Sequence, residues 1–406
     1  MKILFTNAFY NPNIQGGAEI TLQHLAERLQ ARGHEVSILT TGPLESECLL
    51  EDNINGVRVF RAKLFNIYWH YGKDRPYPLK RALWHVFDIY NPVMGKEVFN
   101  IVRRIRPDVV SLHNLAGFSA AAWHAIKRTG TPMVQVLHDY YSLCPNNNMF
   151  RTNKACSHRC MRCRLFRFLH PKLSNLVDAV VGVSRFVIDR HLNNGLFKNA
   201  QFKQVIYNTR SLIDLPKEVI ARPRLPIRFG FMGTLTPSKG IELLLEFFIK
   251  VKNNNAELFV AGSGKLYYEE MLKERFSTPR IHFLEYVPTE RFFPQIDALI
   301  VPSLCHDSLP GVVFESLAYG VPVIASNRGG IPEMIQHGVN GFLFDPYCPG
   351  QLESTIRRVT KDRNLIEAMR ETCISTAKPF LNIEKWTDKW EALYGKVSGL
   401  SKEIEC

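Results

Sequence analysis

The sequence predicts an α/β protein built from two doubly wound, Rossmann-like domains. Short apolar, β-branched stretches alternate along the chain with stretches of helical length, which is the pattern of β-α-β units. A glycine-rich turn follows the first expected strand in each half of the chain, and a proline-rich polar stretch separates the halves. A length of 406 residues also suits two domains better than one.

The first half of the chain is expected to form a domain over residues 1–208. It opens with a strand at Lys2–Thr6, a loop that ends in Gly16 and Gly17, a helix, and a strand at Glu35–Thr40. Glycine before a helix lets a ligand come close to the backbone, although the spacing of the dinucleotide-binding fingerprint is absent. Further strands are expected at Val57–Arg61, Val109–Leu112, Pro132–Leu137, Asp178–Val183 and Phe202–Tyr207.

Two of these strands are followed directly by a histidine. His113 comes after Val109–Leu112, and His138 comes after Pro132–Leu137. Ligands of open α/β sheets collect at the carboxyl ends of the strands, so this position favours a function for His138. A hydrogen-bonded structural histidine is the alternative for both.

A basic, cysteine-rich segment at about 140–175 interrupts the alternation. Cys144, Cys156, Cys160 and Cys163 are separated by 11, 3 and 2 residues. Four thiols this close could bind one structural zinc, and the alternative is a set of reduced, unligated cysteines. The spacing also matches radical-SAM iron–sulfur sites, but those follow the first strand of a barrel, which this chain does not resemble. No reading helix or stacking platform for nucleic acid is evident beside the segment, so we do not expect nucleic-acid binding.

A linker at 209–226 leads into a second domain over 227–380. The domain opens with a strand at Ile227–Met232 and a glycine turn that starts at Gly233 and contains Lys239. Such a turn at a strand-to-helix junction suits a diphosphate. The features that follow are a strand at Glu257–Ala261 before Gly262-Ser263-Gly264, a strand at Ile281–Leu284 before Tyr286-Val287, and, over 381–406, a helix expected to pack towards the first domain.

Two acids flank the start of a predicted helix late in the second domain. A strand at Asp297–Pro302 precedes Asp307, a Ser308–Gly311 turn follows, and Glu315 lies inside the helix. The two acids are expected about 8 Å apart along the helix axis. The free amides and positive pole of a helix start lie between them and favour phosphate. A nucleotide-sugar, with hydroxyls at both ends and a diphosphate in the middle, would match this pattern, whereas two solvated acids are the alternative.

Charge is distributed unevenly between the halves. Residues 1–210 contain 28 Lys and Arg against 14 Asp and Glu, whereas residues 211–406 contain 23 against 24. A basic first half suggests an anionic partner such as a membrane leaflet, and a merely soluble basic face is the alternative. The chain begins with a strand, and no stretch of about 18 apolar residues is present. We therefore expect a cytoplasmic protein with reduced cysteines, peripheral to the cytosolic face of a membrane at most.

These motifs, in this order, resemble those of the retaining glycosyltransferases of the GT-B fold, family 4, also called group 1 glycosyltransferases. The resemblance covers nearly the whole chain and implies two Rossmann-like domains that face a central cleft. The matches are Gly16-Gly17-Ala18-Glu19, Val109–Asn114, His138-Asp139 with Cys144-Pro145, Gly233 to Lys239-Gly240, Ala261–Gly264, and the pair Asp307 and Glu315 leading into Gly320–Ala325.

The resemblance implies roles for individual residues. Glu315 would hold the ribose hydroxyls, Asp307 would face the donor sugar, and Lys239 would neutralise the diphosphate leaving group. His138 would lie near the sugar and the acceptor hydroxyl. The remaining binding residues would be Gly16 and Gly17 over the diphosphate, Leu309, Pro310, Gly311 and Val312 at the helix start, Gly233 and Thr234 in the turn that suits the diphosphate, and Gly262, Ser263, Gly264, Tyr286 and Val287 around the base. No metal or other cofactor would be required for chemistry, because lysine and amide dipoles neutralise the leaving group.

Two residues depart from the family pattern, one in the length of its side chain and one in its charge. Asp307 stands where the family usually has Glu, and Thr234 stands where it commonly has Arg. The loss of one of two cations should weaken stabilisation of the diphosphate, and Arg328 beside Gly329-Gly330 could compensate. Donor identity therefore stays open.

The sequence thus predicts a retaining hexosyltransferase that moves a sugar from a nucleoside-diphosphate-sugar to an acceptor hydroxyl. The expected acceptor is a saccharide or lipid-linked saccharide of cell-surface polysaccharide, lipopolysaccharide or glycolipid biosynthesis. The alternatives are a nucleotide-sugar epimerase or hydrolase on the same fold, and a non-enzymatic basic binding protein with a degenerate sugar site.

Overall fold

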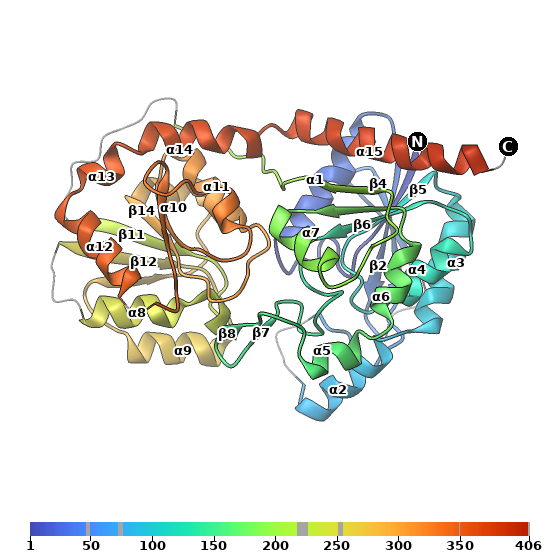
Figure 1. The fold of residues 1–406 in the computed structure, drawn as a ribbon, viewed down its shortest axis with the longest axis horizontal. Helices are drawn as coiled ribbons and strands as arrows, with labels where there is room; N and C mark the ends of the chain where they lie inside the picture. Colours follow the sequence, from blue (N-terminus) through green and yellow to red (C-terminus); the bar gives the residue numbers. More distant parts are fainter. Residues whose placement is uncertain (46–48, 72–75, 217–225, 251–254, 349, 405–406) are drawn as a thin grey trace. The chain divides into compact units, whose positions relative to one another are not determined.

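The structure is a computed structural model that describes residues 1–45, 49–71, 76–216, 226–250, 255–348 and 350–404 (Figure 1). The chain divides into two compact units. Unit 1 comprises Met1–Met149, Ser157–Asn208 and Glu384–Cys406, and unit 2 comprises Phe150–Cys156 and Thr209–Ile383. Within the expected linker, residues 217–225 lie outside the described residues.

Unit 1 contains an eight-stranded sheet in the order β10-β9-β6-β5-β1-β2-β4-β3. All neighbours are parallel except β3 and β4, which form an antiparallel edge. The antiparallel strand β3 was not predicted, because its polar LLEDNI sequence lacks a buried strand's pattern. The strands are β1 (Lys2–Thr6), β2 (Glu35–Gly42), β3 (Leu49–Ile54), β4 (Val57–Lys63), β5 (Val109–Leu112), β6 (Met133–Leu137), β9 (Ala179–Gly182) and β10 (Phe202–Val205).

The central strands of unit 1 are apolar because helices cover both faces of the sheet. In β1 and β5 every residue from Ile3 to Thr6 and from Val109 to Leu112 is buried. Ser184 caps the helix that begins at Arg185, since its hydroxyl accepts a hydrogen bond from the Val187 amide. The helices are α1 (Gly17–Ala31), α2 (Pro78–Phe87), α3 (Pro92–Ile105), α4 (Ala121–Lys127), α5 (Met161–Phe166), α6 (His170–Leu173), α7 (Arg185–Leu192) and α15 (Ile383–Ile404).

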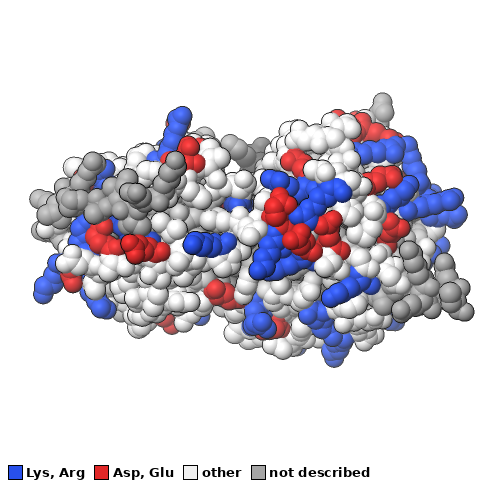
Figure 2. Space-filling model, turned by 90° about the horizontal axis from the view of Figure 1, so that it is seen from above, with Lys and Arg blue, Asp and Glu red and all other residues white. Residues whose placement is uncertain are grey.

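Helix α15 belongs to unit 1 from Glu384 onwards, although it follows the whole of unit 2 in the sequence. Trp390 and Tyr394 are buried, and Arg32 on α1 forms ion pairs with Glu384 and Asp388 at 2.6 and 2.7 Å. Figure 2 shows acidic and basic side chains next to one another on the face that this helix crosses. Exposed ion pairs contribute little, so the buried aromatic side chains provide most of the attachment.

Unit 2 contains a six-stranded parallel sheet in the order β13-β12-β11-β14-β15-β16. The order reverses between β11 and β14, and ligands of doubly wound folds bind at such a switch point. The strands are β11 (Ile227–Met232), β12 (Ala256–Ala261), β13 (Ile281–Leu284), β14 (Ala298–Val301), β15 (Val323–Ser326) and β16 (Gly341–Phe344). The helices are α8 (Ile241–Lys250), α9 (Leu266–Arg275), α10 (Thr289–Phe292), α11 (Gly311–Ala318), α12 (Gln351–Lys361), α13 (Asn364–Glu367) and α14 (Arg370–Ala377).

A small hairpin from the cysteine-rich segment clusters with unit 2. It consists of β7 (Phe150–Arg151) and β8 (Lys154–Ala155), joined by Thr152 and Asn153, both with positive φ. This backbone is the one that two-residue hairpins require. The Ala155 amide donates to the Tyr347 hydroxyl at 2.7 Å, and that hydroxyl donates to a carbonyl after β14. Among the described residues, no helix is both long and apolar enough to span a bilayer.

Candidate active site

Lys239, in the turn after β11, contacts Asp307, in the loop after β14. Lys239 Nζ lies 2.5 Å from Asp307 Oδ1, and the Ser303 hydroxyl donates to Asp307 Oδ2 at 2.5 Å. Burial disfavours the charged form of Lys239, but the adjacent carboxylate of Asp307 favours that form and outweighs the effect of burial. The pKa of Lys239 is therefore raised. The sequence assigned these two side chains to different parts of a ligand, whereas in the structure they form one ion pair.

Two glycines allow this close approach. Gly240 has φ +71°, and a Cβ there would lie 1.9 Å from the Pro302 carbonyl oxygen at the end of β14. Gly329 has φ +61°, and its Cβ would lie 2.0 Å from the Asp307 carbonyl oxygen. Both positions therefore require glycine. A short 3₁₀ turn follows at Ile331–Glu333, and the loop before it supports the backbone of Asp307, because the Gly330 amide donates to the Asp307 carbonyl at 2.8 Å.

Glu315 is buried beside the start of α11. Its carboxylate lies over Gly311, where a Cβ would be 2.9 Å from Glu315 Oε1. Arg210 Nε lies 3.5 Å from the same oxygen, and both side chains are only about one-eighth exposed, at 12% and 13%. Burial raises the pKa of Glu315, and the guanidinium of Arg210 opposes that rise. The sequence singled out Glu315 but not Arg210, which lies in the expected linker, where no motif marks it.

Arg210 is held in place by the segment before α15. Its backbone amide donates to the Phe380 carbonyl at 3.3 Å, and the Thr209 hydroxyl donates to the same oxygen at 2.6 Å. A Cβ on Gly311 would lie 3.7 Å from an Arg210 Nη, so the guanidinium lies at the N-terminus of α11. Arg328, which was expected to supply a second cation, instead pairs with Asp345 at 2.6 Å.

A pocket of about 440 Å³ lies at the carboxyl ends of β11 and β12. Its lining includes Gly262, Ser263, Tyr286 and Val287, which were expected around a base, together with Gly233 and Thr234 of the glycine turn. Gly264 is not among its lining residues, and a Cβ there would lie 2.3 Å from the Leu235 carbonyl oxygen. Tyr286 is 83% exposed and offers a ring face at the pocket's rim.

In unit 1 an acidic side chain lies at the glycine loop that precedes α1. The Gly16 amide donates to Glu19 Oε2 at 2.9 Å, and Glu19 is buried, which raises its pKa. The carboxylate therefore lies at the N-terminus of α1, where Gly17 is the first helical residue. The expected approach of a diphosphate to Gly16 and Gly17 would bring it close to this acid.

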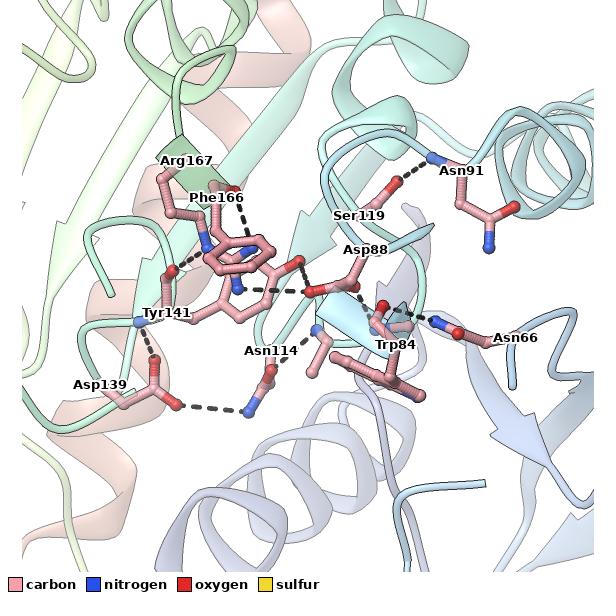
Figure 3. A network of polar contacts seen from close by, with 12 residues as sticks. Asn66, Trp84, Asp88, Asn91, Asn114, Ser119, Asp139, Tyr141, Phe166 and Arg167 are labelled. Atoms are coloured by element: carbon pink, nitrogen blue, oxygen red, sulfur yellow. Dashed lines mark hydrogen bonds and ion pairs between the residues drawn. The ribbon is translucent and has the colours of Figure 1, made fainter. Parts of the chain in front are cut away.

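His138 contacts His113 at the ends of β5 and β6. Their Nε2 and Nδ1 atoms are 2.8 Å apart, and the rings stack at 5.0 Å between centroids. Asp139 accepts hydrogen bonds from the Tyr141 amide and the Asn114 side chain, at 2.7 and 3.3 Å (Figure 3). Burial raises the pKa of Asp139 to about 7.

Comparison with known proteins decides the family. The model of glycosyl transferases group 1 matches residues 217–378, and that of the glycosyl transferase 4-like domain matches residues 16–205. An uncharacterized 42.6 kDa protein in the cps region of Klebsiella pneumoniae is 30% identical over 335 residues, covering 82% of this chain and 87% of that protein. The chain belongs to the group 1 glycosyltransferases. These form a family of retaining enzymes, also called GT4.

Solved structures identify the fold of this glycosyltransferase as GT-B. Sucrose-phosphate synthase from Thermosynechococcus elongatus has a TM-score of 0.76 at 17% identity, with 98% of this chain and 99% of that chain covered. Anabaena HepE in complex with UDP-glucose has a TM-score of 0.69 at 19% identity, with 97% and 100% covered. The expected fold class of two Rossmann-like sheets is confirmed.

The cysteine-rich segment of the glycosyltransferase is anchored by a buried ion pair (Figure 3). Arg167 lies 3.3 Å from Asp88, and both side chains are 0% exposed. Asp88 also accepts the Tyr141 hydroxyl at 2.9 Å, and the guanidinium stacks 4.2 Å from the Tyr141 ring. Arg167, one of the bases of this segment, thus ties the segment to the body of unit 1.

The zinc site expected from the four cysteines is not supported. Cys160 Sγ and Cys163 Sγ are 3.6 Å apart, and a hydrogen bond with Cys163 lowers the pKa of Cys144 to about 6. Cys156 follows the hairpin and belongs to unit 2, whereas the other three belong to unit 1. Throughout the described ranges, no group of three or more His, Cys, Asp or Glu side chains is arranged to hold a metal ion.

Proposed function

We propose that this group 1 glycosyltransferase transfers a hexose from a nucleoside-diphosphate-hexose to a saccharide acceptor of cell-surface polysaccharide or glycolipid biosynthesis. The observation that carries the proposal is the Lys239–Asp307 ion pair at the switch point of the unit 2 sheet. A cation and an acid fixed together suit a leaving diphosphate beside sugar hydroxyls.

The donor would extend along unit 2. The base would occupy the pocket that Tyr286 borders, and the ribose hydroxyls would hydrogen-bond to Glu315. The diphosphate would accept hydrogen bonds from amides at the start of α11, with Lys239 on one side. Arg210, at the same helix start, would supply the second cation that Thr234 lacks. Charge neutralisation by these groups would need no metal or cofactor.

The chemistry would be attack on the same face of the sugar as the leaving group. Lys239 would stabilise the negative charge that develops on the departing diphosphate, while Asp307 would hold the sugar hydroxyls near the anomeric carbon. In unit 1, His138 would contact the sugar and the acceptor hydroxyl. UDP-glucose is the first donor to test, because it is bound in the Anabaena HepE structure.

A membrane surface would deliver a lipid-linked acceptor. Helices α2 and α5 of unit 1 are adjacent, with the His85 and Phe166 rings 5.7 Å apart. Both expose large apolar side chains, and Lys80, Arg81, Arg162 and Arg164 lie among them in the sequence. The exposed apolar residues are Tyr77, Leu79, Leu83, Val86, Phe87, Met161, Leu165 and Phe168. An apolar, cationic face suits the anionic cytosolic leaflet, and the cps-region relative suggests a capsular polysaccharide acceptor.

Nucleotide release from a panel of nucleotide-sugars, with and without saccharide acceptors, tests the proposal. Release that depends on the acceptor and is abolished in Lys239→Met supports transfer. Equal release without acceptor would indicate a hydrolase, and interconversion of the donor would indicate an epimerase. Flotation with phosphatidylglycerol and phosphatidylcholine vesicles tests the surface, since Leu83→Glu should reduce binding to the anionic vesicles.

A further inference from the structure

A row of buried polar side chains runs from α15 to the candidate histidine in unit 1. The Tyr394 hydroxyl lies 2.9 Å from Ser111 Oγ, and Ser111 Oγ lies 3.3 Å from His113 Nε2. His113 Nδ1 then lies 2.8 Å from His138 Nε2. Four side chains from α15, β5 and the loops after β5 and β6 are therefore joined by three successive hydrogen bonds.

Apolar rings enclose the row. Phe5 on β1 lies 5.6 Å from His113 and 6.1 Å from Tyr394, and Trp390 lies 5.6 Å from Tyr394. Ser111 and Tyr394 are fully buried and His113 is 4% exposed, whereas His138 is half-buried. Because water is excluded from such an interior, the buried members hydrogen-bond to one another, and the direction of each bond constrains the next.

The relative acidities of these side chains determine which group donates in each hydrogen bond. A phenol is a stronger acid than an aliphatic hydroxyl, and an imidazole nitrogen is a better acceptor than a phenol oxygen. Tyr394 therefore donates to Ser111, and Ser111 donates to His113 Nε2. His113 must then carry its proton on Nδ1 and donate to His138 Nε2. Burial lowers the pKa of His113 well below its usual range, which keeps this ring neutral and the pattern intact.

We propose that Tyr394, Ser111 and His113 are positioning residues that hold His138 as the neutral tautomer with its proton on Nδ1. In this state His138 Nε2 is occupied as an acceptor, so a ligand that reaches the other ring nitrogen, Nδ1, meets a hydrogen-bond donor. The acidic groups nearest this end of the sheet are Asp139, on the same loop, and Glu19 on α1.

The consequence for catalysis rests on the proposed function. A donor at His138 Nδ1 stabilises oxygen atoms of the sugar or of the departing diphosphate, and it cannot remove a proton from the acceptor hydroxyl. The row of Tyr394, Ser111, His113 and His138, hereafter the relay, therefore assigns His138 to orientation and charge stabilisation rather than to general base catalysis. It also makes α15, at the end of the chain, a part of the site in unit 1.

The position of the proton can be measured without any activity. Long-range ¹H–¹⁵N correlation spectra of the full-length protein labelled with ¹⁵N-histidine distinguish the two neutral tautomers, and His138→Gln assigns the signal. We expect His138 to show a protonated Nδ1 and an unprotonated Nε2 between pH 7 and pH 8. A protonated Nε2 would overturn the proposal, whatever the enzyme proves to transfer.

Variants of the relay give a second readout. In Ser111→Ala, His113 Nε2 loses its donor, so the His138 signals should shift towards a mixture of tautomers, whereas Ser111→Thr retains the hydroxyl and should keep the wild-type pattern. Tyr394→Phe should change the same signals, and Tyr10→Phe, which removes another buried phenol of unit 1, should not. Equal spectra for Ser111→Ala and Ser111→Thr would refute the relay.

With an active donor and acceptor, kcat should fall about fivefold to tenfold in Ser111→Ala, with KM for the donor unchanged. Ser111→Thr should recover most of the rate. An equal fall of kcat in both variants, with the tautomer pattern of His138 unchanged, would mean that Ser111 only stabilises the fold. If no donor is turned over while the proton lies on Nδ1, the proposed function fails and the relay stands.

Discussion

Replacement of Arg167 by methionine should destabilise unit 1 strongly. Asp88 would keep hydrogen bonds from the Gly117 amide and the Tyr141 hydroxyl, at 2.8 and 2.9 Å, but would lose its ion pair with the Arg167 guanidinium, which is 0% exposed like Asp88 itself. Removing one partner of a buried ion pair costs about 3–5 kcal/mol. The lost contact of the guanidinium with the Tyr141 ring adds about 0.5–2 kcal/mol. We therefore expect the free energy of unfolding to fall by at least about 3 kcal/mol.

Tryptophan fluorescence during urea unfolding measures this loss selectively. All five tryptophans, at positions 69, 84, 123, 386 and 390, lie in unit 1, so the signal reports that unit. The double variant Asp88→Asn/Arg167→Met should recover much of the loss, because no uncompensated charge remains. The two single variants should therefore be coupled by more than about 2 kcal/mol.

An exposed pair of unit 1 provides the matched control. Arg58 and Glu51 are 2.8 Å apart with side chains 51% and 37% exposed, so Arg58→Met should cost less than about 1 kcal/mol. The cost of Arg167→Met should also shrink at pH 5, because burial raises the pKa of Asp88 to about 6 and the lone carboxyl can then be neutral. An Arg167→Met cost equal to that of Arg58→Met, or a coupling below about 0.5 kcal/mol, would refute the reasoning.

Three further outcomes follow from the sites. Lys239→Met should lower kcat for nucleotide release about 10²- to 10³-fold, while the thermal unfolding midpoint changes little. Gly329→Ala should lower both stability and activity because its Cβ would meet the Asp307 carbonyl oxygen at 2.0 Å. Gly338→Ala, also at positive φ but with no atom within 4 Å, should lower stability less, through backbone strain alone, and should leave activity unchanged; calorimetry and nucleotide release compare the two. Burial raises the folded-state pKa of Asp139 from 3.8 to about 7. The stability of the wild type relative to Asp139→Asn should therefore decline as the pH rises through about 7. Urea unfolding at pH 5 and pH 8 measures this decline, and an equal difference in stability between wild type and Asp139→Asn at both pH values would mean that the carboxyl is not buried.

The sequence was sufficient to predict the central parallel strands of both sheets. Central strands such as β1 and β14 are continuous apolar runs that pair on both sides, and no other local structure accommodates such runs between helices. Edges were harder to predict. β3 is mostly exposed and polar, so it lacks the pattern of a buried strand, whereas β16 was not predicted although its GFLF sequence is apolar and mostly buried.

For the candidate site, the sequence identified side chains but not their partners. Spacing along α11 indicated Glu315, whereas its partner Arg210 lies 105 positions earlier, in a stretch that looks like a linker. Burial of Arg167 was equally invisible, because nothing in the sequence distinguishes it from Arg162 and Arg164, which are exposed. Ser111 and Tyr394 are 283 positions apart, and only the folded chain brings their hydroxyls together.

The discontinuity of unit 1 has a consequence for how the protein is made. On the ribosome, the strands of the first sheet emerge early, but Trp390 and Tyr394 leave the exit tunnel only after all of unit 2 has been synthesised. The nascent first lobe therefore waits, with the hydrophobic surface beneath α15 uncovered, while the second lobe completes its own sheet without interruption. A chain that stops prematurely at residue 383 would carry a finished second lobe and an N-terminal lobe without its closing helix.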